Sequence, residues 1–241
     1  MKVAAYQAPL LPGGSMEALE LIRDRVKWCE TEGVGILCCP EAVLGGLADD
    51  AERPADIAID AESGQLQTLL GPLASKSVTA IVGFTEIVSG GKLYNAAAVF
   101  QDGKVVGIYR KRHPAIRRSV YSAGDQSPVF TVGPLSFGIM ICNDSNYPEL
   151  ATNMAARGAR VIFLPSNNSL PPEMADVVAL SRTVDTARAT DNEVMIVRAD
   201  VAGRIADRVS FGSSAIVDAR GTLIRAGKAL SQDVLVADVG I

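Results

Sequence analysis

The 241-residue sequence contains one histidine, four cysteines and only 5% aromatic residues. It has no CxxC pair and no cysteine–histidine cluster with the spacing of metal ligands. Zinc sites are built largely from these two residue types, so we expect no metal site and no cofactor. The cysteines Cys29, Cys38, Cys39 and Cys142 also lack the dense pattern of a small disulfide-bonded protein.

The sequence also lacks a large excess of positive or negative charge and has no long apolar run near its start. The 23 basic and 27 acidic residues give a net charge of −4, which argues against a nucleic-acid partner, because phosphate binding needs a concentrated basic surface. The first apolar run is interrupted at Gln7 and Pro9 and is too short for a signal peptide core or a membrane span. We therefore predict a cytoplasmic protein with no membrane partner.

Alanine, valine, isoleucine and leucine dominate the 48% hydrophobic content, which favours buried strands flanked by helices. An amphipathic helix is predicted from Ser15, as its N-terminal cap, to Gly33, as its C-terminal cap. The apolar runs 2–7 and 34–39 flank this helix, and a strand–helix–strand unit of that length indicates parallel pairing.

The later segments continue the alternation. Two hairpins are predicted, with turns at Asp102-Gly103 and Gly133-Pro134. Two βαβ-like segments predict two sheets with helices outside both, and no linker divides the chain, so we expect one domain over 1–241. The other predicted helices cover about 66–73, 147–157 and 172–190, and the other strands cover 78–84, 160–165, 193–199, 210–217, 222–225 and 233–239.

Three ionisable residues follow predicted strands: Glu41, Lys111 and Cys142. Strand ends are where the sites of α/β proteins gather. Each residue also has a structural interpretation, as a turn cap, a solvated lysine and a buried apolar thiol respectively. Together, however, a carboxylate, an ammonium and a thiol can carry out acyl transfer without histidine, as base, charge stabiliser and nucleophile.

The segments LCCPEAVLGG, GIYRKRHP and GIMICNDSNYPEL occur in this order and resemble the three signature blocks of the nitrilase superfamily, the carbon–nitrogen hydrolases. The resemblance extends from VAAYQAP at the start to GSSAIVDARG near the end. It implies an α/β fold, a four-layer α-β-β-α sandwich, that pairs into a homodimer or higher homo-oligomer. It also implies that Glu41 is the general base, Lys111 the cationic stabiliser and Cys142 the nucleophile.

The backbone N–H of Asn143, next to the nucleophile, is then expected to be a second oxyanion donor, because a strand-to-helix turn leaves such groups free. We interpret Asp144, Pro148 and Glu149 as a helix entry. Arg188 and Asn192, in the resembling segment ARATDN, are expected to be structural.

The loop after Lys111 departs from the family. Many members carry a further glutamate there, whereas PAIRRSVYSAGDQ contains none and offers Arg117, Arg118 and Ser119. Either another group fills the role or activity has been lost. The two arginines could bind an acidic substrate group, since guanidinium matches carboxylate bidentately, or could be exposed loop charges.

His113 raises a papain-like protease as an alternative, but the residues around Cys142 lack that family's local signature. We interpret His113 as a hydrogen-bonding residue beside the site. Ser166 and Asn167 follow the strand at 160–165, where they could line the pocket or form an ordinary turn.

The leading functional prediction is hydrolysis of a small linear amide, through a cysteine thioester, to a carboxylic acid and ammonia. Nitrile and N-carbamoyl hydrolysis would use the same three groups, and a non-catalytic scaffold of the same fold is a further alternative. The sequence does not identify the substrate.

Overall fold

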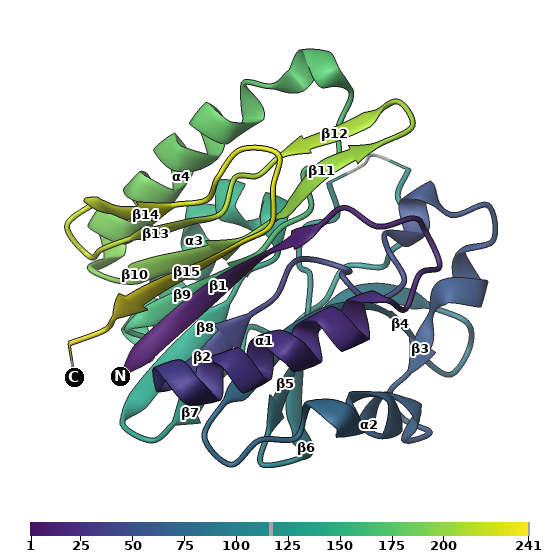
Figure 1. The fold of residues 1–241 in the computed structure, drawn as a ribbon, viewed down its shortest axis with the longest axis horizontal. Helices are drawn as coiled ribbons and strands as arrows, with labels where there is room; N and C mark the ends of the chain where they lie inside the picture. Colours follow the sequence, from purple (N-terminus) through teal and green to yellow (C-terminus); the bar gives the residue numbers. More distant parts are fainter. Residues whose placement is uncertain (116–117, 241) are drawn as a thin grey trace.

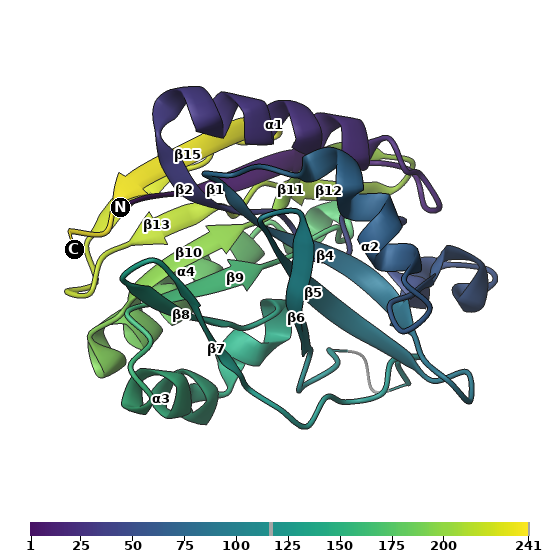
Figure 2. The same cartoon turned by 90° about the horizontal axis from the view of Figure 1, so that it is seen from below.

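The computed structural model describes residues 1–115 and 118–240. Two sheets pack face to face, and helices cover the outer face of each, so that four layers are seen edge-on in Figure 2. Helices α1 (Ala18–Glu32) and α2 (Gln65–Leu70) cover the first sheet, and α3 (Pro148–Ala156) and α4 (Val177–Asn192) cover the second. This is the four-layer arrangement that the resemblance implies.

Within the described residues the first sheet has nine strands, with the central order β12-β11-β1-β2-β4-β5-β6, while β15 pairs with β1 and β3 pairs with β4 (Figure 1). The second sheet has six strands in the order β14-β13-β10-β9-β8-β7. The first comprises β1 (Lys2–Pro9), β2 (Val34–Cys38), β3 (Ile59–Asp60), β4 (Thr79–Ile87), β5 (Leu93–Gln101), β6 (Lys104–Arg110), β11 (Val201–Ile205), β12 (Arg208–Phe211) and β15 (Asp233–Asp238). The second comprises β7 (Val129–Val132), β8 (Leu135–Ile139), β9 (Val161–Pro165), β10 (Met195–Ala199), β13 (Ala215–Val217) and β14 (Leu223–Ala226).

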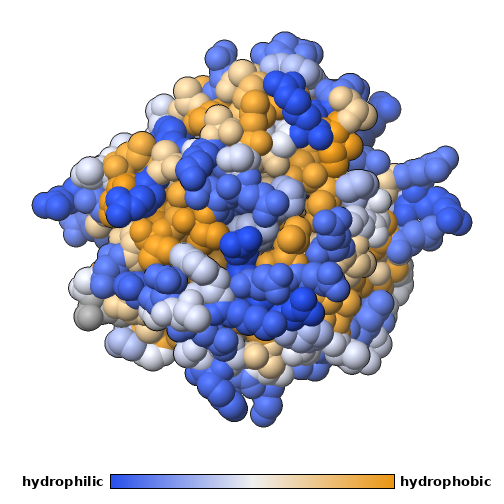
Figure 3. Space-filling model, viewed as in Figure 1, coloured by the Kyte–Doolittle hydropathy of each residue, from blue (hydrophilic) through white to orange (hydrophobic). Residues whose placement is uncertain are grey.

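Helix α1 forms because apolar residues recur on one of its faces. Ala18, Ile22, Val26 and Cys29 are buried against the first sheet, and the outward face is mostly hydrophilic in Figure 3. Fully burying an aliphatic side chain such as Ile22 contributes about 1.5–3 kcal/mol. Gly33 ends the helix with φ of 68°, a left-handed conformation that glycine adopts without strain.

The predicted N-terminal cap of α1 is wrong. Glu17 occupies the cap position without a side-chain cap bond. The Ser15 hydroxyl instead accepts a hydrogen bond from the Glu17 N–H (3.3 Å), one turn before the helix begins.

Two apolar cores lie on opposite faces of the first sheet. Cys38 belongs to the core shared with the second sheet, together with Ile36 and Phe163. Cys39 belongs to the core beneath α1 and α2. The adjacent cysteines therefore face opposite ways, as the alternation of side chains along an extended chain predicts.

Both predicted hairpins are present. Asp102 and Gly103 have φ of 50° and 74°, as a type I′ turn requires, and β6 then ends directly before Lys111. The turn at Gly133 joins β7 to β8, which leads to Cys142. These connections bring the two side chains to the same end of the molecule.

Several elements between residues 172 and 217 differ from those predicted from the sequence. The predicted strand 210–217 is two strands in different sheets, because Gly212 (φ 83°) breaks the extended chain after β12. Strand β11 was not predicted. The predicted helix 172–190 begins at Val177, and a short 3-10 turn over Pro172–Met174 precedes it.

The remaining 3-10 turns are Ala48–Asp50, Pro54–Ile57, Gly71–Leu73 and Cys142–Asn146. The third of these continues α2, whose early end was expected from Gly71-Pro72. Among the described residues, no helix has the length and apolar character needed to cross a membrane.

Candidate active site

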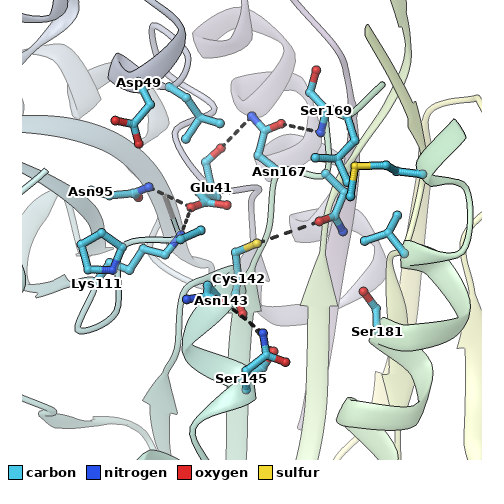
Figure 4. A pocket seen from close by; sticks show the side chains of 18 of the residues that line it. Glu41, Asp49, Asn95, Lys111, Cys142, Asn143, Ser145, Asn167, Ser169 and Ser181 are labelled. Carbon is cyan, nitrogen blue, oxygen red and sulfur yellow. Dashed lines mark hydrogen bonds and ion pairs between the residues drawn. The ribbon is translucent and has the colours of Figure 1, made fainter. Parts of the chain in front are cut away.

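A cavity of about 440 Å³ opens where strands of both sheets end. Glu41 and Lys111 reach it from segments that follow β2 and β6, in the first sheet. Cys142 and Asn167 reach it from segments that follow β8 and β9, in the second sheet. The fold thus brings together three side chains that the sequence singled out, as Figure 4 shows.

Glu41 and Lys111 form a buried ion pair. The Lys111 ammonium lies 2.5 Å from Oε1 of Glu41, and the two side chains are 5% and 2% exposed. Asn95 donates from Nδ2 to the same Oε1 (2.8 Å). Both of these hydrogen bonds use one carboxylate oxygen, which leaves the Oε2 of Glu41 available to receive a proton.

The backbone around Glu41 is held from both sheets. Its N–H donates to the carbonyl of Ser166 (3.2 Å), and β4 passes directly behind the loop at Gly83. A Cβ at Gly83 would lie 2.6 Å from the Ala42 nitrogen and closer still to the Pro40 carbonyl oxygen. Only glycine therefore lets the loop carrying Glu41 lie this close to the strand.

Cys142 begins the 3-10 turn that follows β8 and has φ of 45°, a conformation that is strained for a residue with a side chain. The buried Asp144 carboxylate maintains this turn. It accepts hydrogen bonds from the Ile141 N–H (3.0 Å), the His113 N–H (2.8 Å) and the Tyr109 hydroxyl (2.7 Å). Asn143 is in the first turn of this short helix, where backbone N–H groups have no partner within the helix.

Burial, with the charge of Glu41, favours a neutral Cys142 thiol at rest. Burial and the negative charge of Glu41 raise the pKa of Cys142 to about 12, and Lys111 offsets only part of this effect. For Lys111, burial is the largest single effect and lowers the pKa, but the nearby acidic groups, Glu41 first, and the hydrogen bond to Glu41 together outweigh it, so the pKa is raised. The site therefore holds an ammonium–carboxylate pair beside a protonated cysteine.

Of the predicted pocket residues that follow β9, Asn167 lies on the cavity wall and Ser166 does not. Asn167 donates from Nδ2 to the Glu41 carbonyl (3.4 Å). The buried Ser166 hydroxyl accepts a hydrogen bond from Arg198 (2.7 Å).

The structure does not place His113 or Arg118 on the cavity wall. The His113 ring stacks on Tyr147 with 3.5 Å between ring centroids. The backbone carbonyl of His113 accepts a hydrogen bond from Nδ2 of Asn143 (3.1 Å). Arg117 lies outside the described residues. Arg188 donates to the Ser145 carbonyl (2.9 Å), in keeping with the structural role expected of it.

Several residues of the cavity were not predicted from the sequence. Asn95 and Asn168 are buried polar residues on its wall, and Asn168 Oδ1 lies 3.9 Å from the Cys142 sulfur. Arg198 also lines it, 2% exposed and paired with the buried Asp185 (2.8 and 2.5 Å). A polar residue inside an apolar strand was the signal that could have identified Asn95.

One side of the cavity is apolar, and its rim is charged. At the rim, Asp50 pairs with Arg208 (2.9 Å), while Asp49 accepts hydrogen bonds from the Ser119 hydroxyl and the Val120 N–H. The apolar side is formed by residues of α4 and the segment before it: Leu170, Met174, Val177, Leu180 and Val184. Among the described residues, no group of three or more His, Cys, Asp or Glu side chains could hold a metal ion.

Comparison with known proteins identifies the family. The sequence model of the carbon-nitrogen hydrolases matches residues 2–240. The chain belongs to the carbon–nitrogen hydrolase family. This carbon–nitrogen hydrolase is 28% identical to an (R)-stereoselective amidase of a Pseudomonas species, over 95% of this chain and 81% of that protein.

A nitrilase of Pyrococcus abyssi is also 28% identical, over 90% of this chain and 80% of that protein. The structure of a carbon–nitrogen hydrolase from Helicobacter pylori superposes with a TM-score of 0.86 at 21% identity, over 98% of this chain and 88% of that one. At this identity the superposition supports the fold alone. The family and fold inferred from the sequence blocks are therefore confirmed.

Proposed function

We propose that this carbon–nitrogen hydrolase converts small linear amides to a carboxylic acid and ammonia through a thioester on Cys142. The observation that carries the proposal is the buried Glu41–Lys111 ion pair in the same cavity as the Cys142 thiol. A thiol alone beside apolar side chains would be ordinary packing. A desolvated ion pair beside it costs folding free energy, which a purely structural cavity does not require.

In the first half-reaction Glu41 takes the thiol proton as the sulfur attacks the carbonyl carbon. Because the pKa of the resting thiol is about 12, attack and proton transfer are coupled rather than preceded by a stable thiolate. Lys111 and the Asn143 N–H stabilise the negative charge on the oxygen. The C–N bond then breaks, the nitrogen takes the proton from Glu41, and ammonia leaves.

In the second half-reaction Glu41 takes a proton from water, which attacks the thioester carbon. The C–S bond breaks, the sulfur regains a proton from Glu41, and the acid is released. The ammonium of Lys111 keeps its charge throughout, because its pKa is raised in the pair. Glu41 is thus the only group that must change protonation state besides the sulfur and the substrate.

The apolar side of the cavity supports an acyl group with an apolar body. Arg208 at the rim and Arg198 on the wall are already paired, with Asp50 and Asp185 respectively. The hypothesis that Arg117 and Arg118 bind an acidic substrate group stays a prediction, and Arg118 does not lie on the cavity wall. We propose neutral amides such as butyramide ahead of acidic ones.

Ammonia release from a panel of amides, nitriles and N-carbamoyl compounds tests the proposal. We expect the largest kcat/KM for a primary amide and no turnover by Cys142→Ala at an unchanged melting temperature. Faster release from nitriles or carbamoyl compounds would assign one of the alternative reactions. Absence of turnover with every compound would favour the scaffold.

We also propose that residues 1–241 act as one domain and that the protein assembles as a homodimer or larger homo-oligomer. The first proposal is supported by the core shared between the two sheets, and the second by the family resemblance. Light scattering after size-exclusion chromatography measures the assembly.

A further inference from the structure

Asn168 is a buried side chain beside the nucleophile whose orientation is fixed by its neighbours. It follows β9, is 7% exposed and lines the cavity. Its backbone N–H donates to Oδ1 of Asp200 (2.9 Å). Its Nδ2 donates to Oδ2 of Asp200 (3.1 Å) and to the Ser213 hydroxyl (2.9 Å).

Asp200 and Ser213, which accept hydrogen bonds from Asn168 Nδ2, exclude the opposite orientation of the amide group. Asp200 is fully buried, and as a carboxylate it is an acceptor only. The Ser213 hydroxyl already donates its proton to Asp200 (2.7 Å), so it can only accept from Asn168. Turning the amide over would place its oxygen against two acceptors. Both Nδ2 hydrogens are thus used, and the Oδ1 oxygen faces the cavity.

This oxygen lies 3.9 Å from the Cys142 sulfur, a contact drawn as a dashed line in Figure 4. The distance is long for a strong hydrogen bond, and a carbonyl oxygen has two lone pairs. Asn168 approaches the sulfur from the second sheet, whereas Lys111 and Glu41 come from the first. The cavity therefore offers hydrogen-bond donors for a substrate oxygen. The segment after β9 adds an acceptor, Asn168 Oδ1, whose orientation is fixed.

An amide bound for attack by Cys142 has an oxygen, which needs donors, and an NH₂ group, which needs an acceptor. We propose that Asn168 Oδ1 accepts a hydrogen bond from the NH₂ of the substrate, and that the Asp200–Ser213 pair makes Asn168 a specificity-determining residue for amides. This inference rests on the proposed function. The hydrogen bond holds the nitrogen while Glu41 delivers its proton, and the C–N bond then breaks to give ammonia.

An ester of the same acid has no N–H on its leaving atom and gives the same thioester on Cys142. Deacylation is therefore identical for the two substrates, and their kcat/KM values differ only through acylation. The intrinsic reactivities of amide and ester are the same in every variant, so a change in the ratio of kcat/KM for butyramide to that for methyl butyrate reports the contribution of the Asn168 acceptor.

We would measure this ratio for Asn168→Ser and for Ser213→Ala. A serine at 168 keeps a donor for Asp200 but has no carbonyl facing the cavity. Ser213→Ala keeps Asn168 and removes one of the two groups that fix it. Asn153→Ala, an exposed asparagine on α3, is the matched control. Melting temperatures show which variants are folded.

We expect the amide-to-ester ratio to fall about tenfold in Asn168→Ser, the effect of losing one buried hydrogen bond, and less in Ser213→Ala. The Asn153→Ala ratio is expected to equal that of the parent. An equal fall in both activities would show that Asn168 acts on the sulfur and would overturn the inference, as would no change. If the parent itself releases no ammonia from any amide, the proposed function fails instead.

Discussion

Glu41 and Lys111, which lie 70 residues apart in the sequence, form a buried ion pair with 2.5 Å between Oε1 and Nζ. The pair is formed by segments that follow two strands of the same sheet, and it faces a cysteine from the other sheet. Its consequence is a division of tasks, because Lys111 stays charged while the second oxygen of Glu41 is available for proton transfer.

Replacing Glu41 by glutamine removes the proposed base while keeping the size of the side chain. We expect turnover to fall by at least about 10²–10⁴, since the proposed mechanism uses this one group as general acid and base in both half-reactions. Steady-state ammonia release and the melting temperature are measured together.

Glu86→Gln is the matched control for that variant. Glu86 is also buried, and it pairs with Arg110 (2.6 Å) away from the cavity. It is expected to lose stability but to keep its turnover. If Glu41→Gln retained turnover within about tenfold of the parent, which is a change of about 1.4 kcal/mol in the barrier, the assignment of the base would fail.

Glu41→Gln is also expected to lower the pKa of the Cys142 thiol, although it reduces turnover. Burial and the charge of Glu41 raise the pKa of Cys142 to about 12 in the parent, while Lys111 lowers it. Removing the negative charge leaves Lys111 as the nearest charge, so the pKa of Cys142 should fall even though catalysis is lost. Thiolate absorbance against pH, with Cys142→Ser in each background as the baseline, measures this shift. An unchanged or higher pKa would contradict the electrostatic account.

The sequence located the proposed triad because each of its members follows an apolar strand, and strand ends meet at one edge of a sheet. The hairpin turn at Asp102-Gly103 also placed Lys111 correctly, since its two positive φ values are encoded locally. Local signals of this kind can be read from the sequence because they do not depend on contacts between distant segments.

The residues that the sequence missed depend on contacts between distant segments. Asp185 is a charged residue within a helix, where the sequence pattern does not indicate burial, yet it is fully buried because Arg198 from β10 pairs with it. Asn168 becomes informative only through Asp200 and Ser213. Since Ser213 fell inside a predicted strand, its turn toward Asp200 could not be foreseen.

The close approach of β4 to the loop carrying Glu41 makes Gly83→Ala a further test. The added methyl group would lie 2.6 Å from the Ala42 nitrogen, so that β4 or the loop carrying Glu41 would have to shift. We expect lower stability by about 1–3 kcal/mol, as in other overpacked interiors, together with reduced turnover. Gly71→Ala, where an added Cβ meets nothing within 4 Å, is the control. Parent-like melting and turnover in Gly83→Ala would show that the loop is not held as described.

Alkaline pH should destabilise the folded protein. Burial raises the pKa of Tyr6, Tyr121 and Cys29 to about 12, whereas the ordinary values are 10 for tyrosine and 9 for cysteine. A raised pKa in the folded state means that the stability contribution is fully present below the ordinary value and is lost as the pH rises toward 12. The melting temperature is expected to fall from pH 9 upward, and less steeply in Cys29→Ala. A constant melting temperature between pH 9 and 11 would contradict this expectation.

The covalent intermediate provides the most direct test of the central claim. The enzyme is mixed with its best primary amide, quenched in acid during turnover, digested and analysed by mass spectrometry. The account predicts an acyl group on the peptide that contains Cys142, none on the peptides with Cys29, Cys38 and Cys39, and no adduct in Cys142→Ala. Full turnover by Cys142→Ala, or an acyl group on another cysteine, would contradict it.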